Sequence, residues 1–304
     1  MSAASLRTEC TLSPSSTKLR PLSTSLFLII TVGQFVVSGI GGEYIPPMTL
    51  PSLNLNGKVA FITGTGSGIG RALSIGLAQS GADVAVTELP DKMDAARETV
   101  REIEKTGRRG FAVPLDVSKL PMISESLDAA LKHFGRLDIL VNNAGINIPR
   151  PAVDVTEAEW DKIMAIDLKG VFFATQAAAK KAFIPQGSGK VVNIASQMGV
   201  VGYMYRSAYC SAKAGVVNLT RVLAFEWAKL KINVNTIAPT FLDTPLTRPM
   251  FENKEFFNDV MSRIPMGRLA TPEDIVGAAV YLSSPAADMV TGHTLLVDGG
   301  WTTV

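Results

Sequence analysis

The chain has 304 residues, of which 47% are hydrophobic and 18% are charged, and its formal net charge is +2. Two cysteines and two histidines are too few for a disulfide framework or a zinc site, so we expect no metal. The near-neutral charge, without a long basic run, argues against nucleic acid as a partner. Length and composition instead suit a soluble enzyme with a sizeable core.

The first 53 residues differ from the rest of the chain. Residues 1–20 are rich in Ser and Thr, and residues 26–40 form an apolar stretch that is shorter than the roughly 20 residues needed to span a bilayer. We expect residues 1–53 to be an N-terminal extension, either disordered or a targeting or anchor segment. Residues 54–304 are predicted to form the single folded domain. A cytoplasmic location is expected, and membrane association or targeting through residues 26–40 is the alternative.

Seven short apolar runs alternate with stretches of helical length from residue 58 onward. Near-continuous apolar strands indicate a sheet that is buried on both faces, and alternation with helices indicates parallel strands. The pattern predicts an α/β fold: one Rossmann-like, doubly wound domain with a seven-stranded parallel sheet and helices on both faces. The expected strands are residues 59–63, 84–87, 110–115, 138–141, 190–194, 232–237 and 294–297.

A glycine-rich turn follows the first expected strand. Residues 63–70 read Thr-Gly-Thr-Gly-Ser-Gly-Ile-Gly, and a helical stretch begins at Arg71. Glycines let the backbone approach a pyrophosphate closely, and the next helix offers its N–H groups and dipole to that anion. The strand–turn–helix context favours a dinucleotide site over an ordinary glycine-rich turn. The expected cofactor contacts in the turn are Gly64, Ser67, Gly68, Ile69 and Gly70.

Two acidic residues follow the next two strands. Glu88 ends the second strand, where a carboxylate can accept hydrogen bonds from both ribose hydroxyls of NAD and would repel the 2′-phosphate of NADP. Ser67 supplies no positive charge to offset that repulsion, so the sequence favours NAD as the cofactor over NADP. The alternative for Glu88 is a solvated glutamate. Asp116, after the third strand, is expected either to accept from the adenine amino group or to cap the next helix.

The strongest catalytic signal lies between residues 196 and 213. Tyr209 and Lys213 are four residues apart and share one helix face. The pKa of a free phenol is about 10, and a nearby ammonium lowers it toward working pH. Such a tyrosine can take a proton from an alcohol while hydride leaves its carbon. Ser196, at the end of the fifth strand, can hold the same substrate oxygen.

Together, these motifs resemble the short-chain dehydrogenase/reductase family, in its NAD-preferring type with a Tyr-x-x-x-Lys pair, over roughly the last 250 residues. The resemblance implies hydride transfer between NAD(H) and a secondary alcohol or ketone, with Tyr209 as general acid/base. It implies that Lys213 binds the nicotinamide ribose and lowers the pKa of Tyr209, and that Ser196 positions the substrate oxygen. Further implied cofactor contacts are Val117 in the adenine pocket, the segment Asn142-Asn143-Ala144-Gly145 at the inner edge, and Thr244 at the nicotinamide.

Two residues depart from the family pattern. Asp167 stands where the family usually has an asparagine that supports a water-mediated proton relay to the lysine, so we include it among the catalytic residues. If ionised, it would attract Lys213 and weaken the effect of Lys213 on Tyr209. This departure supports the alternative of a catalytically silent, nucleotide-binding relative. Thr240 stands where a glycine is common and adds a side chain beside the nicotinamide pocket.

Two segments, residues 199–207 and 240–265, are expected to determine the substrate. Their side chains favour a cyclic or lipophilic alcohol of specialised metabolism, with a sugar or polyol dehydrogenase as the alternative. The resemblance also implies a homotetramer or homodimer that pairs residues 157–184 and 208–230. The expected apolar pocket residues are Val200, Val201, Tyr203, Met204, Phe241, Leu246, Met250 and Phe251.

Overall fold

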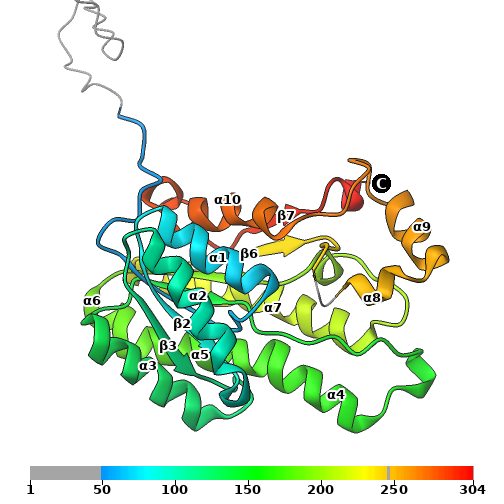
Figure 1. Ribbon diagram of the computed structural model, residues 1–304, viewed down its shortest axis with the longest axis horizontal. Helices are drawn as coiled ribbons and strands as arrows, with labels where there is room; N and C mark the ends of the chain where they lie inside the picture. Colours follow the sequence, from blue (N-terminus) through cyan, green and yellow to red (C-terminus); the bar gives the residue numbers. More distant parts are fainter. Residues whose placement is uncertain (1–48, 245–246, 304) are drawn as a thin grey trace, which may run out of the picture. The chain divides into compact units, whose positions relative to one another are not determined.

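Seven parallel strands form one sheet in the computed structural model, which describes residues 49–244 and 247–303. Their order across the sheet is β3-β2-β1-β4-β5-β6-β7 (Figure 1). This order and the parallel pairing confirm the predicted doubly wound fold. The expected extension lies outside the described residues apart from residues 49–53. The strands are β1 (Val59–Ile62), β2 (Asp83–Glu88), β3 (Gly110–Pro114), β4 (Ile139–Asn142), β5 (Gly189–Ile194), β6 (Ile232–Pro239) and β7 (Thr294–Val297).

Helices cover both faces of the sheet. One face packs against α1 (Gly68–Gln79), α2 (Met93–Lys105) and α10 (Pro272–Ser283). The other packs against α3 (Leu120–Phe134), α5 (Val171–Ala178) and α7 (Ser207–Trp227). Two short helices, α8 (Arg248–Phe251) and α9 (Lys254–Ser262), follow β6 in the chain (Figure 1). No helix in the described part of the chain is both long and apolar enough to cross a bilayer.

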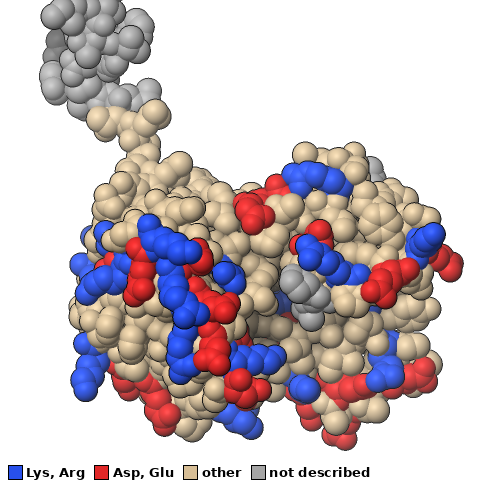
Figure 2. All heavy atoms as spheres, viewed as in Figure 1, with Lys and Arg blue, Asp and Glu red and all other residues tan. Residues whose placement is uncertain are grey.

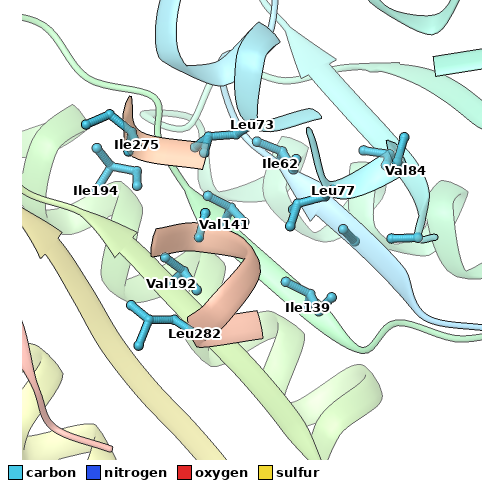
Figure 3. Packing of buried hydrophobic residues seen from close by; sticks show 14 of the residues in the cluster. Ile62, Leu73, Leu77, Val84, Ile139, Val141, Val192, Ile194, Ile275 and Leu282 are labelled. Atoms are coloured by element: carbon cyan, nitrogen blue, oxygen red, sulfur yellow. The ribbon is translucent and has the colours of Figure 1, made fainter. Parts of the chain in front are cut away.

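The strands are mostly apolar because alternate side chains enter two different cores. Ile62 of β1 and Val141 of β4 pack with Leu73 of α1 and Ile275 of α10 on one face (Figure 3). Phe61, the neighbour of Ile62, enters the other core, together with residues of α3 and α7. Burial on both faces fixes the register of the strands, so the residues that follow each strand meet at one edge of the sheet.

One long helical stretch is interrupted by two wider turns. The helices α4 (Glu157–Met164), α5 and α6 (Ile184–Gln186) are joined by π-helical turns, η3 (Ala165–Gly170) and η4 (Ala179–Phe183). A Cβ on Gly170 would lie 2.9 Å from the carbonyl oxygen of Val117, so η3 packs closely on the segment after β3. Such turns are frequent at functional sites, and η3 contains Asp167.

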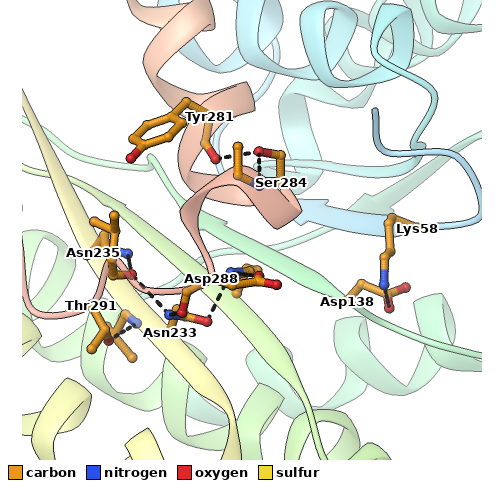
Figure 4. A network of polar contacts seen from close by, with 12 residues as sticks. Lys58, Asp138, Asn233, Asn235, Tyr281, Ser284, Asp288 and Thr291 are labelled. Atoms are coloured by element: carbon orange, nitrogen blue, oxygen red, sulfur yellow. Dashed lines mark hydrogen bonds and ion pairs between the residues drawn. The ribbon is translucent and has the colours of Figure 1, made fainter. Parts of the chain in front are cut away.

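Polar side chains stabilise the end of the sheet at which the parallel strands begin. Lys190 Nζ donates to Asp288 Oδ1 (2.7 Å), and the Asn233 and Asn235 amides donate to carbonyls in the segment before β7 (Figure 4). Asp138 accepts from the Val59 N–H at the start of β1 (3.0 Å). These contacts are structural. The polar residues that could take part in chemistry lie at the opposite edge, where the strands end.

Candidate active site

The turn between β1 and α1 is folded tightly against the end of β4. Gly64 has φ +70°, and a Cβ there would lie 3.0 Å from Ala144 Cα. A Cβ on Gly70 would lie 2.0 Å from the Gly64 carbonyl oxygen. The Asn143 amide donates to the carbonyls of Thr63 (2.9 Å) and Gly64 (2.8 Å). Asn143, expected to contact the cofactor, therefore shapes the turn with its side chain.

The amino end of α1 is suited to an anion. Ser67 precedes the helix in an extended conformation and makes no capping hydrogen bond with its side chain. The first N–H groups of a helix have no partner within it, and they carry the positive end of the dipole. A Cβ on Gly68 would lie 3.7 Å from Thr244 Cγ2, so the segment after β6 reaches the same turn. The expected contacts of the turn and Thr244 thus converge on one place, which fits the pyrophosphate and nicotinamide end of a dinucleotide.

Glu88 is held beside this turn. Its Oε2 accepts from the Gly66 N–H (2.8 Å), and its Oε1 accepts from the Leu89 N–H (3.0 Å). A Cβ on Gly66 would lie 2.8 Å from Oε2, so only glycine allows this approach. A carboxylate has about four acceptor positions, and two of them remain for ribose hydroxyls. Glu88 is therefore a fixed acceptor at the turn and not a freely solvated side chain.

The segment after β3 is fixed mainly by contacts within the protein. Asp116 Oδ1 accepts from the N–H (2.9 Å) and the hydroxyl (2.7 Å) of Ser118, which closes a turn ahead of α3. This contact fits the structural alternative for Asp116 more closely than the adenine contact, although Lys119, not Asp116, occupies the N-cap of α3. Val117 is buried and packs on Gly170.

A buried lysine lies at the centre of the site. Tyr209 and Lys213 occupy consecutive turns of α7, and Lys213 Nζ lies 5.6 Å from the centre of the Tyr209 ring. Nζ also donates to the Ile194 carbonyl (3.1 Å) and lies 3.1 Å from Asp167 Oδ2. α7 and the end of β5 thus bring together the predicted Tyr209, Lys213 and Ser196.

Asp167 forms a buried ion pair with this lysine. Its side chain is completely buried, and its Oδ1 accepts from the Ile146 N–H (2.9 Å). Burial raises the pKa of Asp167, and the charge of Lys213 opposes that rise. Burial alone would lower the pKa of Lys213, but Asp167 and Tyr209 outweigh it and raise that pKa. The predicted attraction between Asp167 and Lys213 is therefore present in the structure.

Tyr209 feels opposing influences. The pKa of its phenol lies above its usual value, because burial raises it most, Lys213 lowers it only in part, and the negative charge of Asp167 raises it further. The expected lowering by Lys213 is therefore present but outweighed. A hydrogen bond with Ser196 favours the phenolate. Ser196 Oγ also accepts from the Met198 N–H (3.1 Å), which fixes the serine after β5. A phenol with an ammonium and a hydroxyl beside it can exchange a proton with an alcohol oxygen held between them.

A chain of buried polar side chains, not predicted from the sequence, connects the ends of β4, β5 and β6. The Asn142 amide donates to Thr175 Oγ1 and to Asn193 Oδ1 (both 2.8 Å). The Asn193 amide donates to Thr220 Oγ1 (2.9 Å), which is bonded to Thr236. Asn142, expected at the inner edge of the cofactor, is instead committed to this network. The signal was an asparagine near the end of two adjacent apolar strands.

Apolar and aromatic residues pack together the described parts of residues 199–207 and 240–265, the two segments expected to determine the substrate, which we call the lid. Of the expected pocket residues, five belong to one cluster with Trp301 and Tyr209: Val201, Tyr203, Phe241, Met250 and Phe251. Val200 and Met204 are about half exposed, and Leu246 lies outside the described residues. The Tyr203 hydroxyl donates to Asp259 of α9 (2.6 Å), which links the two segments. Much of the apolar character thus packs the lid onto the domain.

The surface is hollowed next to these elements. Figure 2 shows a recess between the part of the molecule that carries α2 and the part that carries α8 and α9.

Thr240, the second departure from the family pattern, is buried, and its hydroxyl has no hydrogen-bond partner among the described residues.

Comparisons with known proteins agree with this geometry. A family model described as enoyl-(acyl carrier protein) reductase matches residues 64–302. The 2-dehydro-3-deoxy-D-gluconate 5-dehydrogenase of Escherichia coli is 41% identical over 255 residues, which are 84% of this chain and 99% of that protein. The D-threitol dehydrogenase of Mycolicibacterium smegmatis is 39% identical over 82% of this chain and 94% of that protein. The 3beta-hydroxysteroid dehydrogenase 1 of Eggerthella lenta is 37% identical over 82% and 95%.

Solved structures give the same result. A putative 2-deoxy-D-gluconate 3-dehydrogenase from Agrobacterium tumefaciens, with bound NADP, is 42% identical and superposes with a TM-score of 0.75. The match covers 83% of this chain and 99% of that one.

Proposed function

Since the chain belongs to the short-chain dehydrogenase/reductase family and is an oxidoreductase acting on CH–OH groups, we propose that its substrate is a polyol or a sugar-derived hydroxy compound. The observation that carries the proposal is the group formed at the end of β5 by the partly buried Tyr209 and the buried Lys213 and Asp167. The relatives from E. coli and M. smegmatis act, by their names, on polyhydroxylated substrates, which favours the sugar or polyol alternative.

The residues of the site have distinct roles in this reaction. Tyr209 takes the proton of the reacting hydroxyl in oxidation and returns it in reduction. Ser196 holds the substrate oxygen, and Lys213 stabilises the phenolate by its charge. Asp167 positions Lys213 and binds the Ile146 N–H, which fixes the segment after β4. When bound, the nicotinamide accepts or supplies the hydride.

The cofactor is proposed to be NAD(H), held by the turn from Gly64 to Gly70 and by Glu88. The carboxylate of Glu88 beside Gly66 supports this preference, because it would repel a 2′-phosphate. The structure of the relative from A. tumefaciens contains bound NADP, and the titration with both cofactors described below distinguishes the two on this chain.

A second candidate is a lipophilic alcohol, as the substrate segments first indicated. The aromatic cluster of Tyr203, Phe241, Phe251 and Trp301 beside Tyr209 supports it, as does the relative that is named a steroid dehydrogenase. Because this cluster mainly packs the lid, the polyhydroxylated substrate remains the main proposal.

The chain is further proposed to act as a homodimer or homotetramer in the cytoplasm. Support for assembly comes from an apolar groove between the α4–α5 stretch and α7. The groove is lined mostly by Met164, Leu168, Phe172, Phe173, Leu219 and Val222. A second copy of the same helices would cover it, since two-fold interfaces pair the same patch on both subunits.

The test is cofactor binding and turnover of the full-length chain. NADH and NADPH are titrated by fluorescence, and initial rates are measured against neutral polyols, aldonates and cyclic alcohols. We expect turnover of a polyhydroxylated compound and a loss of about 10²–10⁴-fold in Tyr209→Phe, the range for one acid/base group. NADH binding should persist in that variant. NADH binding without any Tyr209-dependent turnover would instead support the catalytically silent alternative.

A further inference from the structure

Arg206 carries a buried positive charge that no acidic side chain within 4 Å neutralises among residues 49–244 and 247–303. Only 4% of the residue is exposed. Among the described residues its side chain makes one hydrogen bond, a long one from Nη1 to the carbonyl of its neighbour Tyr205 (3.3 Å), and its buried Nε has no partner there. Arginine stays charged in proteins, and an uncompensated buried charge is costly.

The backbone around Arg206 is held in an unusual shape. Tyr205 has φ +61°, a left-handed conformation that is a genuine outlier for a bulky residue. Its carbonyl accepts from the Arg150 N–H (3.0 Å) as well as from Arg206. The Arg206 carbonyl accepts from the Cys210 N–H (2.7 Å) at the start of α7. Strain of this kind persists only where the surroundings impose it, and it gathers at functional sites.

Arg206 is the N-cap residue of α7, the helix that carries Tyr209 and Lys213. It precedes Tyr209 by three residues, and its charge interacts with the phenols of Tyr203 and Tyr209. Burial lowers the pKa of its guanidinium, because desolvation disfavours the charged form.

Two other cations near these tyrosines are neutralised. Lys213, beside Tyr209, is paired with Asp167, and Arg263, over the Tyr203 ring, is paired with Asp259. The positive charge of Arg206 is therefore not balanced by the described residues. A bound anion would pair with it and remove the cost of burying it alone.

We propose that Arg206 binds a carboxylate of the substrate, so that the enzyme prefers a hydroxy acid of the sugar-acid class over the matching neutral polyol. A guanidinium fork suits a carboxylate, and charge-assisted hydrogen bonds in a buried place are strong. This inference rests on the proposed function and deepens it, since it assigns the feature of the substrate that is recognised away from the reacting hydroxyl.

The first test compares two probes that differ only at one terminal carbon. D-gluconate and D-glucitol are titrated calorimetrically into the full-length, NADH-loaded protein. We expect gluconate to bind about 10–100-fold more tightly than glucitol, the range for hydrogen bonds to a charged group. Arg206→Met should remove this difference and leave the affinities for NADH and glucitol within about twofold. Arg268→Met, which changes an exposed arginine paired with Asp274, is the matched control and should keep the difference.

The second test separates binding from a structural role. Because Arg206→Met removes an uncompensated buried charge and keeps the length of the side chain, the ligand-free variant should melt at the same temperature as the wild type or higher. Gluconate should raise the melting temperature of the wild type and not that of the variant. A variant that fails to fold, or that melts well below the wild type, would assign Arg206 to the structure and overturn the proposal.

Different results would overturn the role of Arg206 and the proposed function. Tyr209-dependent turnover of glucitol, with no preference for gluconate, would overturn the role of Arg206 and leave the proposed function standing. Arg206-dependent binding of gluconate without turnover of any alcohol would support the carboxylate site and overturn the proposed function. Equal binding of both probes by the wild type would overturn the carboxylate site directly.

Discussion

Glu88→Gln is the most direct perturbation of cofactor choice. In the wild type the Gly66 N–H donates to Oε2 of Glu88 (2.8 Å). The substitution removes the negative charge and keeps an oxygen that can accept this hydrogen bond. The turn should therefore keep its shape, because the conformations of Gly64 and Gly70 do not depend on the charge. We expect the variant to bind NADPH more tightly and NADH more weakly than the wild type.

The size of the effect follows from the position of the carboxylate. Two like unit charges 4 Å apart repel by about 4 kcal/mol at an effective dielectric constant of about 20. Glu88 is only partly buried, so solvent and salt reduce this to about 1–2 kcal/mol. On the NADH side, the variant loses the charge assistance of its ribose hydrogen bonds, which is worth about 1 kcal/mol. The ratio of the two dissociation constants should shift by about 30–150-fold toward NADPH.

The assay is a fluorescence titration of the full-length chain with each cofactor. Glu104→Gln is the control, because it removes the same charge from an exposed position on α2. A ratio that moves less than about twofold, or that moves equally in the control, would refute the assignment of Glu88 to the ribose.

The remaining predictions concern the groups around Tyr209. In Asp167→Asn, the pKa of Tyr209 should fall. Burial still raises that pKa and Lys213 still lowers it, but the negative charge of Asp167, which also raises it, is gone. Oxidation needs the phenolate, so the acid limb of the kcat/KM profile against pH should move to lower pH; an unmoved or higher limb would contradict the coupling. In Asn142→Leu, the partners Thr175 and Asn193 lose their donor. Urea unfolding should show a loss of about 1–3 kcal/mol for each group left unpaired, with the NADH affinity of the folded variant unchanged, and a selective loss of NADH affinity would restore Asn142 to the cofactor site. In Phe173→Glu, a charge enters the groove beside α7, so light scattering should report a smaller assembly than for the wild type; an unchanged mass would remove this groove from the interface.

The fold could be read from the sequence because its signals are local. Each of the seven expected strands lies within two residues of an observed one, since apolar runs bounded by glycine and polar residues leave few other choices. The π-helical turns η3 and η4 could not be read in this way. They add a residue to a helical turn without a break in composition, and their place is set by packing, as at Gly170 on Val117.

The candidate site was predictable where function rests on spacing and less so where it rests on burial. Tyr209, Lys213 and Ser196 are brought together as expected. Three predicted residues bind partners within the protein instead of facing the cofactor. The partners of Asn142 and Asn143 lie more than 30 positions away in the sequence, and the partner of Asp116 is Ser118. Arg206 looked like any polar loop residue, because a missing counter-charge can be seen only when the neighbours are known.

The strand order also sets the order in which the chain can fold. β1 pairs with β4, so that Ala60 lies beside Ile139, and the residues between them must be made before this central pair can form. Until then, the first half of the sheet has an open apolar edge at β1. Closing such long loops slows folding, and an exposed strand edge invites association with other chains. We therefore expect the growing chain to expose this edge of β1–β3 until β4 is made, and substitutions that slow the pairing of β4 should lower the yield of folded protein before they alter the finished enzyme.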